Sequence, residues 1–541
     1  MKLLRPSETL ARVGLHAHTL PGALDARVAA GPERPFLVDG ARTWTFKELA
    51  RDASAAARLL LEAGVTAGDR VVVTSPTSAE LVIALFAIAR LGASFVPVSP
   101  ELRTEEAARV IERSRPRVVL HGAAQAELAE AVAPAARRLD LDASFAALAS
   151  LPALALSHPQ PSPDDTCLVL FTSGTTGAPK GVMHAHRTFV VAGEGFVERQ
   201  WLQPDDRMLC VLPMFHVNAL FYSLGGALAA GATLILGGRF SASRFWPLVA
   251  ESGATQANLL GSIGRILAVR PRSEYVKGHA LDRVYCVPMP ADVQRVFREE
   301  LGVRWIAEGY GMSEVPGIFA QPYGERPRVG AMGSVCRHPD GRPLGRVRVV
   351  DERGEQVPLG AVGTLEVKTE LVMQGYFEAP DLTRAGFRDG YFITGDRVRE
   401  VEPGVYEFVA RDQEIIRRRG ENVSAPEIDN AALACPGVAE AAAVAVPSEL
   451  GEDDILLAVV ARPGESVVAQ EVHAQLSQRL SAAKVPRYVV VVADLPRGPT
   501  QRVLRHRLAA DEALRRAATD FAARSPPAEP AATSLRSRPK E

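Results

Sequence analysis

The feature that most constrains the fold is a regular alternation of helical and strand-like segments between Thr45 and Leu120. Thr45 and Glu48 form a capping box at the start of a helix that we expect to end near Ala63. The elements expected after it are a strand at Arg70–Thr74, a helix at Ala79–Leu91, a strand at Phe95–Val98, a helix at Glu105–Ser114 and a strand at Arg117–Leu120. Such alternation is typical of a parallel sheet with crossover helices. The sequence therefore predicts an α/β fold.

The pattern changes twice further along the chain, which indicates more than one domain. Short β-rich segments separated by Gly, Pro and Asp turns fill Gly330–Val409 and predict a small β-subdomain. A new run of helices and strands starts at Ser424 and predicts a compact α+β unit. A chain of 541 residues is also too long for one ordinary core. The predicted domains are a large multi-sheet one over residues 1–411, a small mobile one over residues 412–514, and a helix end with a disordered tail over residues 515–541.

Charge argues against nucleic-acid and membrane partners. The formal net charge of -1 leaves no long-range field that would attract either kind of polyanion. One uncharged stretch, Met208–Gly238, is longer than the ~20 apolar residues of a membrane span. Because Pro213, His216 and Asn218 interrupt its first half, we interpret it as buried core containing a helix at Leu220–Ala230. We therefore expect no membrane span.

The cysteines and the N-terminal segment bear on the compartment. The five cysteines are odd in number, widely scattered and never arranged as CxxC with a following Cys or His cluster, which argues against a disulfide framework or a zinc site. The first residues, MKLLRPSETLARVG, contain no apolar run long enough for a secretory signal. Both observations favour a cytoplasmic protein.

A glycine- and threonine-rich loop is the strongest local signal of chemistry. The apolar run Leu168–Phe171 reads as a buried strand that opens into the loop Thr172–Gly181. Glycines allow backbone N–H groups to line a concavity, hydroxyls donate hydrogen bonds, and Lys180 adds a cation, a combination that suits a polyphosphate. It differs from a Walker A loop because Ala178 and Pro179 stand before the lysine. The predicted nucleotide-binding residues of this loop are Thr172, Ser173, Gly174, Thr175, Thr176 and Gly177.

This string resembles the phosphate loop of the adenylate-forming superfamily, which includes acyl-CoA synthetases, luciferases and peptide-synthetase adenylation domains. The resemblance covers about residues 20 to 510. Further motifs appear in the family's order: PMFHVNAL (213–220), GYGMSE (309–314), YFITGD (391–396), RDQEIIRRRGENVSAPEID (411–429) and LPRGPTQRVLRHRL (495–508). The phrases FHVNALFYS, FSASRFW and RRGENVSAPEID are most similar to the carnitine and crotonobetaine CoA-ligase branch.

The resemblance implies roles for residues around ATP. Tyr310 is expected to stack on adenine, with Gly311 beside it and the Ser313 hydroxyl at the α-phosphate. Glu314 is expected to hold Mg²⁺ through a carboxylate oxygen. Asp396 and Arg411 are expected at the ribose hydroxyls, and Lys180 is expected to take part in catalysis.

It also implies where the acid and the thiol lie. His216 matches the family histidine that lines the acyl pocket and gates ATP entry, and Asn218, Tyr285 and Gly309 are predicted to line the same pocket. The small domain is expected to pivot at Gln413 so that one site serves two half-reactions. Its predicted thioester-forming face comprises Arg417, Gly420 and Glu421.

Two departures from the family pattern affect the expected chemistry. The family's closing motif has a Gly-Lys pair whose lysine acts during adenylation, whereas this chain has Gln501 and Arg502, which keeps the charge but not the shape. Arg505 or Arg507 are alternatives for that role. Small Gly-Gly-Ala-Pro residues are replaced by bulkier ones starting at Tyr285, which favours a small or functionalised acid over a long fatty chain.

We therefore predict an AMP-forming acid–thiol ligase that uses ATP, Mg²⁺ and CoA. A carboxylate would attack the α-phosphorus of ATP, and the CoA thiol would then displace AMP. One alternative is a stand-alone adenylating enzyme that passes its adenylate to a carrier-protein thiol, an amine or another nucleophile, including nitrite-type activation. Another is a weakly active nucleotide-binding pseudoenzyme. The sequence leaves the acid, the acceptor and the choice between monomer and homodimer open.

Overall fold

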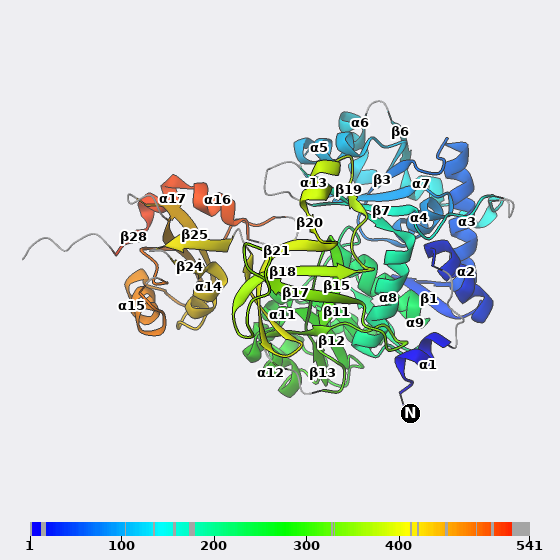
Figure 1. The fold of residues 1–541 in the computed structure, drawn as a ribbon. Helices are drawn as coiled ribbons and strands as arrows, with labels where there is room; N and C mark the ends of the chain where they lie inside the picture. The colour runs from blue at the N-terminus through cyan, green and yellow to red at the C-terminus, as the bar shows by residue number, and fades with distance from the viewer. Residues whose placement is uncertain are drawn as a thin grey trace, which may run out of the picture. The chain divides into compact units, whose positions relative to one another are not determined.

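The computed structural model describes residues 3–11, 18–102, 104–133, 136–154, 158–172, 179–325, 328, 330–411, 414–418, 421–448, 453–482, 484–498 and 503–521. The chain divides into two compact units, Met1–Phe408 and Val409–Glu541, which are described separately below (Figure 1). The predicted domain bounds near residue 411 stay a prediction, and the predicted pivot, Gln413, lies outside the described residues.

The first sheet of the large unit contains the predicted alternation. Its strand order is β19-β8-β7-β4-β3-β5-β6, and β3, β4 and β5 run parallel as expected. The strands are β3 (Arg70–Thr74), β4 (Ser94–Val98), β5 (Val118–His121), β6 (Arg137–Asp140), β7 (Thr166–Thr172), β8 (Lys180–Ala185) and β19 (Gly375–Tyr376). The helices of this region are α3 (Phe46–Glu62), α4 (Ala79–Arg90), α5 (Thr104–Ser114), α6 (Ala126–Val132) and α7 (Leu141–Phe145). The expected helices and strands between Thr45 and Leu120 are thus confirmed, with ends shifted by one residue.

The predicted capping box is present at the start of α3. The Glu48 backbone N–H donates to Thr45 Oγ1 at 3.2 Å, and the Glu48 carboxylate accepts from the Thr45 N–H at 2.8 Å. The bond from the Thr45 backbone lowers the pKa of Glu48. Two of the unpaired donors at the helix start are therefore satisfied by side chains within the same turn.

The second sheet contains the strands around the uncharged stretch. Its order is β13-β12-β11-β9-β10-β1-β2. The strands are β1 (Pro35–Asp39), β2 (Arg42–Thr45), β9 (Arg207–Cys210), β10 (Thr233–Leu236), β11 (Gln256–Leu260), β12 (Arg283–Val287) and β13 (Trp305–Ala307). The neighbouring helices are α1 (Pro6–Ala11), α2 (Leu20–Ala30), α8 (His186–Gln200), α9 (Gly225–Ala230), α10 (Phe245–Ser252), α11 (Gly261–Val269) and α12 (Ala291–Glu299). Helix α8 is buried along almost its whole length.

The uncharged stretch is buried core, as predicted. The helix expected at Leu220–Ala230 begins earlier, because a π-helix, η3 (Asn218–Leu224), precedes α9. The wider π-turn was not predicted, since periodicity does not separate it from an α-helix. No helix of the described residues is long and apolar enough to cross a membrane.

The third sheet forms the predicted β-rich region and is antiparallel. Its order is β14-β15-β16-β22-β21-β18-β17, with β20 paired to β21. The elements are β14 (Gly309–Met312), β15 (Val315–Ala320), β16 (Ala331–Val335), β17 (Gly345–Val350), β18 (Val362–Thr369), α13 (Pro380–Ala385), β20 (Phe387–Arg388), β21 (Tyr391–Glu402) and β22 (Val405–Arg411). The sequence predicted this region to start at Gly330, but β14 and β15 also belong to the sheet.

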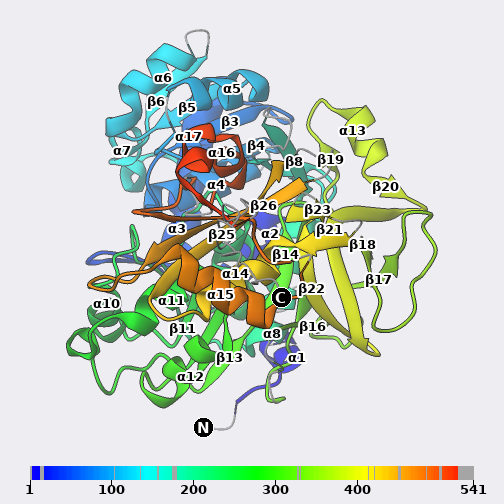
Figure 2. The same ribbon diagram turned by 90° about the vertical axis from the view of Figure 1, so that its left-hand side faces the viewer.

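The small unit is an α+β fold, as predicted (Figure 2). A four-stranded sheet has the order β25-β26-β27-β28, and a separate hairpin pairs β23 with β24. The elements are β23 (Ile415–Arg418), β24 (Glu421–Ser424), α14 (Ala425–Leu433), β25 (Val438–Pro447), β26 (Asp453–Ala461), α15 (Ala469–Arg479), β27 (Tyr488–Val492), α16 (Arg505–Ala510), α17 (Glu512–Ala517) and β28 (Thr519–Asp520). Strand β28 was not predicted; it lies in the segment interpreted as a helix end and tail. Residues 522–541 are outside the described chain.

Candidate active site

The predicted phosphate loop connects two paired strands. Thr172 ends β7 and is opposite Lys180, the first residue of β8. The Thr172 hydroxyl donates to the Lys180 carbonyl at 3.5 Å. Ser173, Gly174, Thr175, Thr176 and Gly177 lie outside the described residues. The pairing of β7 with β8 thus keeps Thr172 and Lys180, which flank the glycine-rich part of the predicted loop, next to each other.

Tyr376 brings Lys180 and Glu314 into one cluster. The ammonium of Lys180 lies 5.7 Å from the centre of the Tyr376 ring, and the Tyr376 hydroxyl donates to Glu314 Oε1 at 2.9 Å. Burial, and then the neighbouring carboxylate, raise the pKa of Tyr376, so that its hydroxyl stays a donor. Two of the predicted site residues, Lys180 and Glu314, therefore face one tyrosine, on a strand that pairs with β8.

Tyr310 and Asp396 are joined directly. The Tyr310 hydroxyl donates to Asp396 Oδ2 at 2.5 Å, and both residues are buried. The two predicted nucleotide-binding residues come from β14 and β21, which belong to the same sheet. A shared hydrogen bond fixes the ring and the carboxylate relative to each other.

The GYGMSE motif lies in a β-hairpin. Strand β14 carries Tyr310 and Gly311, and the turn between β14 and β15 contains Ser313. The ring of buried His184 donates from Nε2 to the Ser313 carbonyl at 2.7 Å, and burial lowers the pKa of His184 to about 4. A neutral histidine therefore anchors the turn that presents the predicted phosphate-binding hydroxyl.

His216 and Asn218 each have a buried polar atom without a hydrogen-bond partner among the described residues. His216 Nε2 and Asn218 Oδ1 are both buried, and neither has a hydrogen-bond partner in the described part of the chain. Burial lowers the pKa of His216 to about 4, so the ring is neutral at pH 7. Buried polar atoms are normally satisfied, and a π-helical start such as that at Asn218 is common at functional sites. These two atoms are available to a bound molecule.

Tyr285 and Gly309, also predicted to line the acid pocket, are adjacent. A Cβ atom on Gly309 would lie 2.7 Å from the Tyr285 hydroxyl, so only glycine leaves room for that ring. The Tyr285 ring packs edge-on against Phe196 and Tyr222 at centroid distances of 5.5 and 5.7 Å. Tyr285 is thus part of a wall of aromatic rings.

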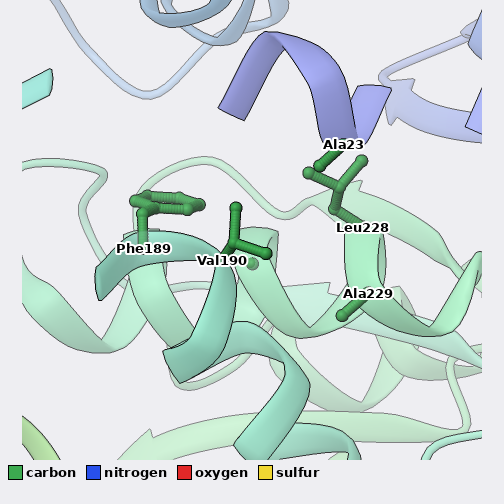
Figure 3. A pocket seen from close by; sticks show the side chains of 6 residues that line it. Ala23, Phe189, Val190, Leu228 and Ala229 are labelled. Atoms are coloured by element: carbon green, nitrogen blue, oxygen red, sulfur yellow. The ribbon is translucent and has the colours of Figure 1, made fainter. Parts of the chain in front are cut away.

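Two cavities of the large unit have no predicted site residue in their lining. The first, about 10 Å³, lies where α2, α8 and α9 meet, and its lining is apolar (Figure 3). Such a space is barely large enough for one water and offers it no hydrogen bond. The second, about 590 Å³, has charged walls that include Arg27, Arg34 and Asp205.

The small unit contains the remaining predicted residues. Arg411 ends β22, and Arg417 and Glu421 belong to the hairpin of β23 and β24. Gly420 and Arg502 lie outside the described residues. Their predicted roles stay predictions, as does the placement of Arg411 at the ribose.

Arg505, an alternative to the missing lysine, is engaged inside the small unit. It forms an ion pair with Asp429 and donates to the Ala443 carbonyl at 2.6 Å. We therefore interpret it as a structural residue.

Sequence reasoning missed two residues of this site, His184 and Tyr376. Neither lies in a motif that was interpreted as functional, although His184 follows the end of the predicted phosphate loop by three residues. Their roles come from contacts with residues far away in the sequence, Ser313 and Glu314. A local pattern does not report such contacts.

Comparison with known proteins identifies the family of the chain. Residues 24–377 match the AMP-binding enzyme family, and residues 427–502 match the AMP-binding enzyme C-terminal domain. A sulfoacetate–CoA ligase of Cupriavidus necator is 32% identical over 504 residues, which cover 91% of this chain and 97% of the relative. A crotonobetaine/carnitine–CoA ligase of Escherichia coli is 29% identical over 488 residues, covering 86% and 93%.

A solved structure supports the same assignment. The crystal structure of ATP-bound MatB from Rhodopseudomonas palustris superimposes with a TM-score of 0.82 at 27% identity and covers 94% of this chain and 98% of that one. The predicted fold class and the predicted type of enzyme, an AMP-forming ligase, are confirmed by these matches. The chain belongs to the AMP-binding enzyme family of adenylate-forming ligases.

Proposed function

We propose that this ligase joins a short, functionalised carboxylic acid to CoA through an acyl-adenylate. The observation that carries the proposal is the cluster of Lys180, Tyr376 and Glu314 beside the strand ends that hold the phosphate loop. A cation over the ring of Tyr376 and an anion at the hydroxyl of the same residue suit a triphosphate with its metal ion.

ATP would be held by residues from three parts of the large unit. Tyr310 offers a ring face for adenine, and Asp396, already bonded to its hydroxyl, has further acceptor capacity for ribose hydroxyls. The anchored turn at Ser313 places a hydroxyl for the α-phosphate. Lys180 and the loop Thr172–Gly177 would take the remaining phosphates.

Glu314 fits a role as the protein's ligand to Mg²⁺. Magnesium sites at nucleotides commonly use one or two carboxylates, with substrate phosphates and waters completing the shell. One oxygen of Glu314 accepts from Tyr376, which orients the carboxylate. Mg²⁺, when bound, supplies charge neutralisation on the phosphates.

The reaction would proceed in two displacements. A carboxylate oxygen of the acid attacks the α-phosphorus, and the bond to pyrophosphate breaks. The CoA sulfur then attacks the acyl carbon, its proton is lost to solvent, and AMP leaves. The neutral His216 would line the acid pocket with Asn218, because each has a buried polar atom without a partner among the described residues.

The acid is proposed to be short because Tyr285 fills the space beside Gly309. Names of relatives agree with this size class. The sulfoacetate–CoA ligase and the crotonobetaine/carnitine–CoA ligase are both named for short acids that carry a second charged group. For the second half-reaction, we propose that the small unit pivots at Gln413 and presents Arg417, Gly420 and Glu421 to the thiol.

The test measures pyrophosphate and AMP with ATP, Mg²⁺ and a panel of short acids, with and without CoA. We expect at least one acid to give CoA-stimulated AMP release and an acyl-CoA product. AMP release that CoA never stimulates would instead support transfer to another acceptor, and no pyrophosphate from any acid would support the pseudoenzyme alternative.

A variant links this activity to the cluster. Glu314→Gln should lower the rate of pyrophosphate release about 100-fold, since one preorganised charge near the reacting phosphates is lost. Glu352→Gln, at an exposed turn, is the matched control and should leave the rate unchanged. Equal rates for both variants would refute the role of Glu314.

A further inference from the structure

Arg199 is a buried cation that the proposed reaction does not use. It belongs to the last turn of α8, and only 3% of its surface is exposed. Its Nη2 donates to the Gly317 carbonyl at 2.6 Å. Its Nε and Nη1 are buried and have no hydrogen-bond partner in the described part of the chain. Two of its donor nitrogens are therefore unused.

No anion of the described residues compensates this charge at pH 7. The ionisable groups that act on the guanidinium are Cys336, Tyr222 and Tyr285. Burial raises the pKa of all three, so they are neutral at pH 7. The Tyr222 ring lies 5.2 Å from the guanidinium carbon and contributes a cation–π contact. An arginine does not escape such a site by losing its proton.

The cluster of Arg199, Tyr222 and Tyr285 converges on the hairpin of β14 and β15. Gly317 has φ of +76°, and any Cβ there would overlap the nitrogens of Arg199. A Cβ on Gly311 would lie 2.7 Å from the Tyr222 hydroxyl, as one on Gly309 would from Tyr285. Glycines at these positions let both phenols pack on β14, which carries Tyr310, and let the guanidinium pack on β15.

This position places Arg199 beside a predicted residue of the acid pocket. The guanidinium interacts with Tyr285, which was predicted from the sequence to line the acid pocket together with Gly309. A charge buried without a partner is costly, so its retention points to a ligand that supplies the partner.

We propose that the cluster of Arg199, Tyr222 and Tyr285 binds a second anionic group of the acid, at the end remote from the reacting carboxylate. The inference rests on the proposed function and narrows it: the substrates are short acids that carry a further carboxylate or sulfonate. Each unused N–H group can donate to an oxygen of this second anionic group, and the neutral phenols are further donors. An acid with a cationic end would meet like charge in the same place.

The first test uses the wild-type protein and needs no variant. Butanoate, succinate, 3-sulfopropanoate and 3-(trimethylammonio)propanoate have similar length and differ in the charge at the remote end. We expect kcat/KM for AMP formation to be about 10- to 100-fold higher for the two anionic acids, because hydrogen bonds to charged groups discriminate by that amount. The ratio between succinate and 3-sulfopropanoate separates a carboxylate from a sulfonate specificity. Turnover of the neutral or cationic acid at an equal or higher kcat/KM would overturn the proposal.

The second test assigns the preference to the cluster. Arg199→Met should raise KM for the anionic acids about 10- to 100-fold with little change for butanoate, and Arg199→Lys should recover part of the loss. Gly317→Ala displaces the guanidinium without removing its charge, and it should also raise KM for the anionic acids. Arg187→Met, at the exposed start of the same helix, is the matched control. An equal loss for all four acids in Arg199→Met would show a structural role and overturn the proposal.

A binding measurement separates failure of this inference from failure of the proposed function. Calorimetric titration of the four acids into the protein with ATP analogue and Mg²⁺ needs no turnover. Anionic acids that bind wild type but not Arg199→Met support the cluster even where no acid forms a CoA thioester. Binding that ignores the remote charge overturns the inference even where CoA thioesters form.

Discussion

Two buried arginines of the large unit, Arg283 and Arg199, differ in whether the protein provides an anion beside the buried charge. Arg283 is 4% exposed and donates to both oxygens of Asp206, at 2.8 and 3.1 Å, and to the Trp201 carbonyl at 2.7 Å. Arg199 is 3% exposed, donates to the Gly317 carbonyl, and among the described residues has only the neutral side chains of Tyr222, Tyr285 and Cys336 as further polar neighbours. The two residues have the same burial and differ in whether the fold supplies an anion.

The difference distinguishes a structural cation from one held for a ligand. The charge of Arg283 is satisfied inside the protein, in a network that also includes Thr255 through Asp206. Arg199 is held by an aromatic wall and by glycines that make room for it, with no internal anion among the described residues. A fold that retains such a charge loses stability unless a ligand pairs with it.

The largest expected effect is at the satisfied arginine. Arg283→Met should lower the free energy of unfolding by about 3–5 kcal/mol, because Asp206 is left as an uncompensated buried charge. Urea unfolding of both proteins measures the change, and a double-mutant cycle with Asp206→Asn isolates the pair. A decrease in the free energy of unfolding below about 1 kcal/mol would contradict the claim that Arg283, unlike Arg199, is a structural residue.

The next largest effect is the loss of stability at low pH that comes from a buried histidine, His184. Burial lowers the pKa of His184 to about 4, below the unfolded value of about 6.5, so the unfolded chain takes up a proton first as pH falls. The contribution of His184 to the free energy of unfolding is therefore fully present above about pH 6.5 and decreases as the pH falls to about 4. The total decrease over this range is about 3 kcal/mol. Urea unfolding at pH 7, 5.5 and 4.5 measures the slope.

His184→Gln is the matched variant for the pH series. A glutamine can still donate to the Ser313 carbonyl but does not titrate. The variant should therefore have a shallower decline than wild type across the same pH range. Identical slopes would show that His184 titrates with an ordinary pKa and would weaken the contrast with Arg199.

The smallest stability effect is expected at the unpaired arginine. Arg199→Met should stay within about 1 kcal/mol of wild type in the absence of ligand, or exceed it, because an unpaired buried charge is replaced by an apolar chain of similar length. Thermal and urea unfolding of the free protein measure it. A loss as large as that of Arg283→Met would mean that Arg199 has an internal partner and a structural role.

Local patterns were enough for the elements and for the family. The capping box at Thr45, the strand before Thr172 and the helix–strand alternation to Leu120 are short-range signals, and each is present in the structure. The uncharged stretch was correctly interpreted as core because its polar interruptions are themselves local. The π-helix at Asn218 and strand β28 were not predicted, since neither has a distinctive periodicity or length.

The candidate site was predictable only where a motif contains its residues. Tyr310, Glu314 and Asp396 were found in motifs, but the hydrogen bond from Tyr310 to Asp396 and the one from Tyr376 to Glu314 join different strands. Contacts of this kind depend on strand order and register, which no local pattern encodes.

The sequence by itself determined the α/β class, the two-unit organisation and the adenylate-forming chemistry, because propensity, periodicity and motif order are properties of neighbouring residues. Only the tertiary structure decided which charges have partners. Arg199 and Arg283 are two arginines of one sequence with nothing local to separate them. Burial and distance separate them, because Coulomb energy and desolvation depend on what surrounds a charge in space.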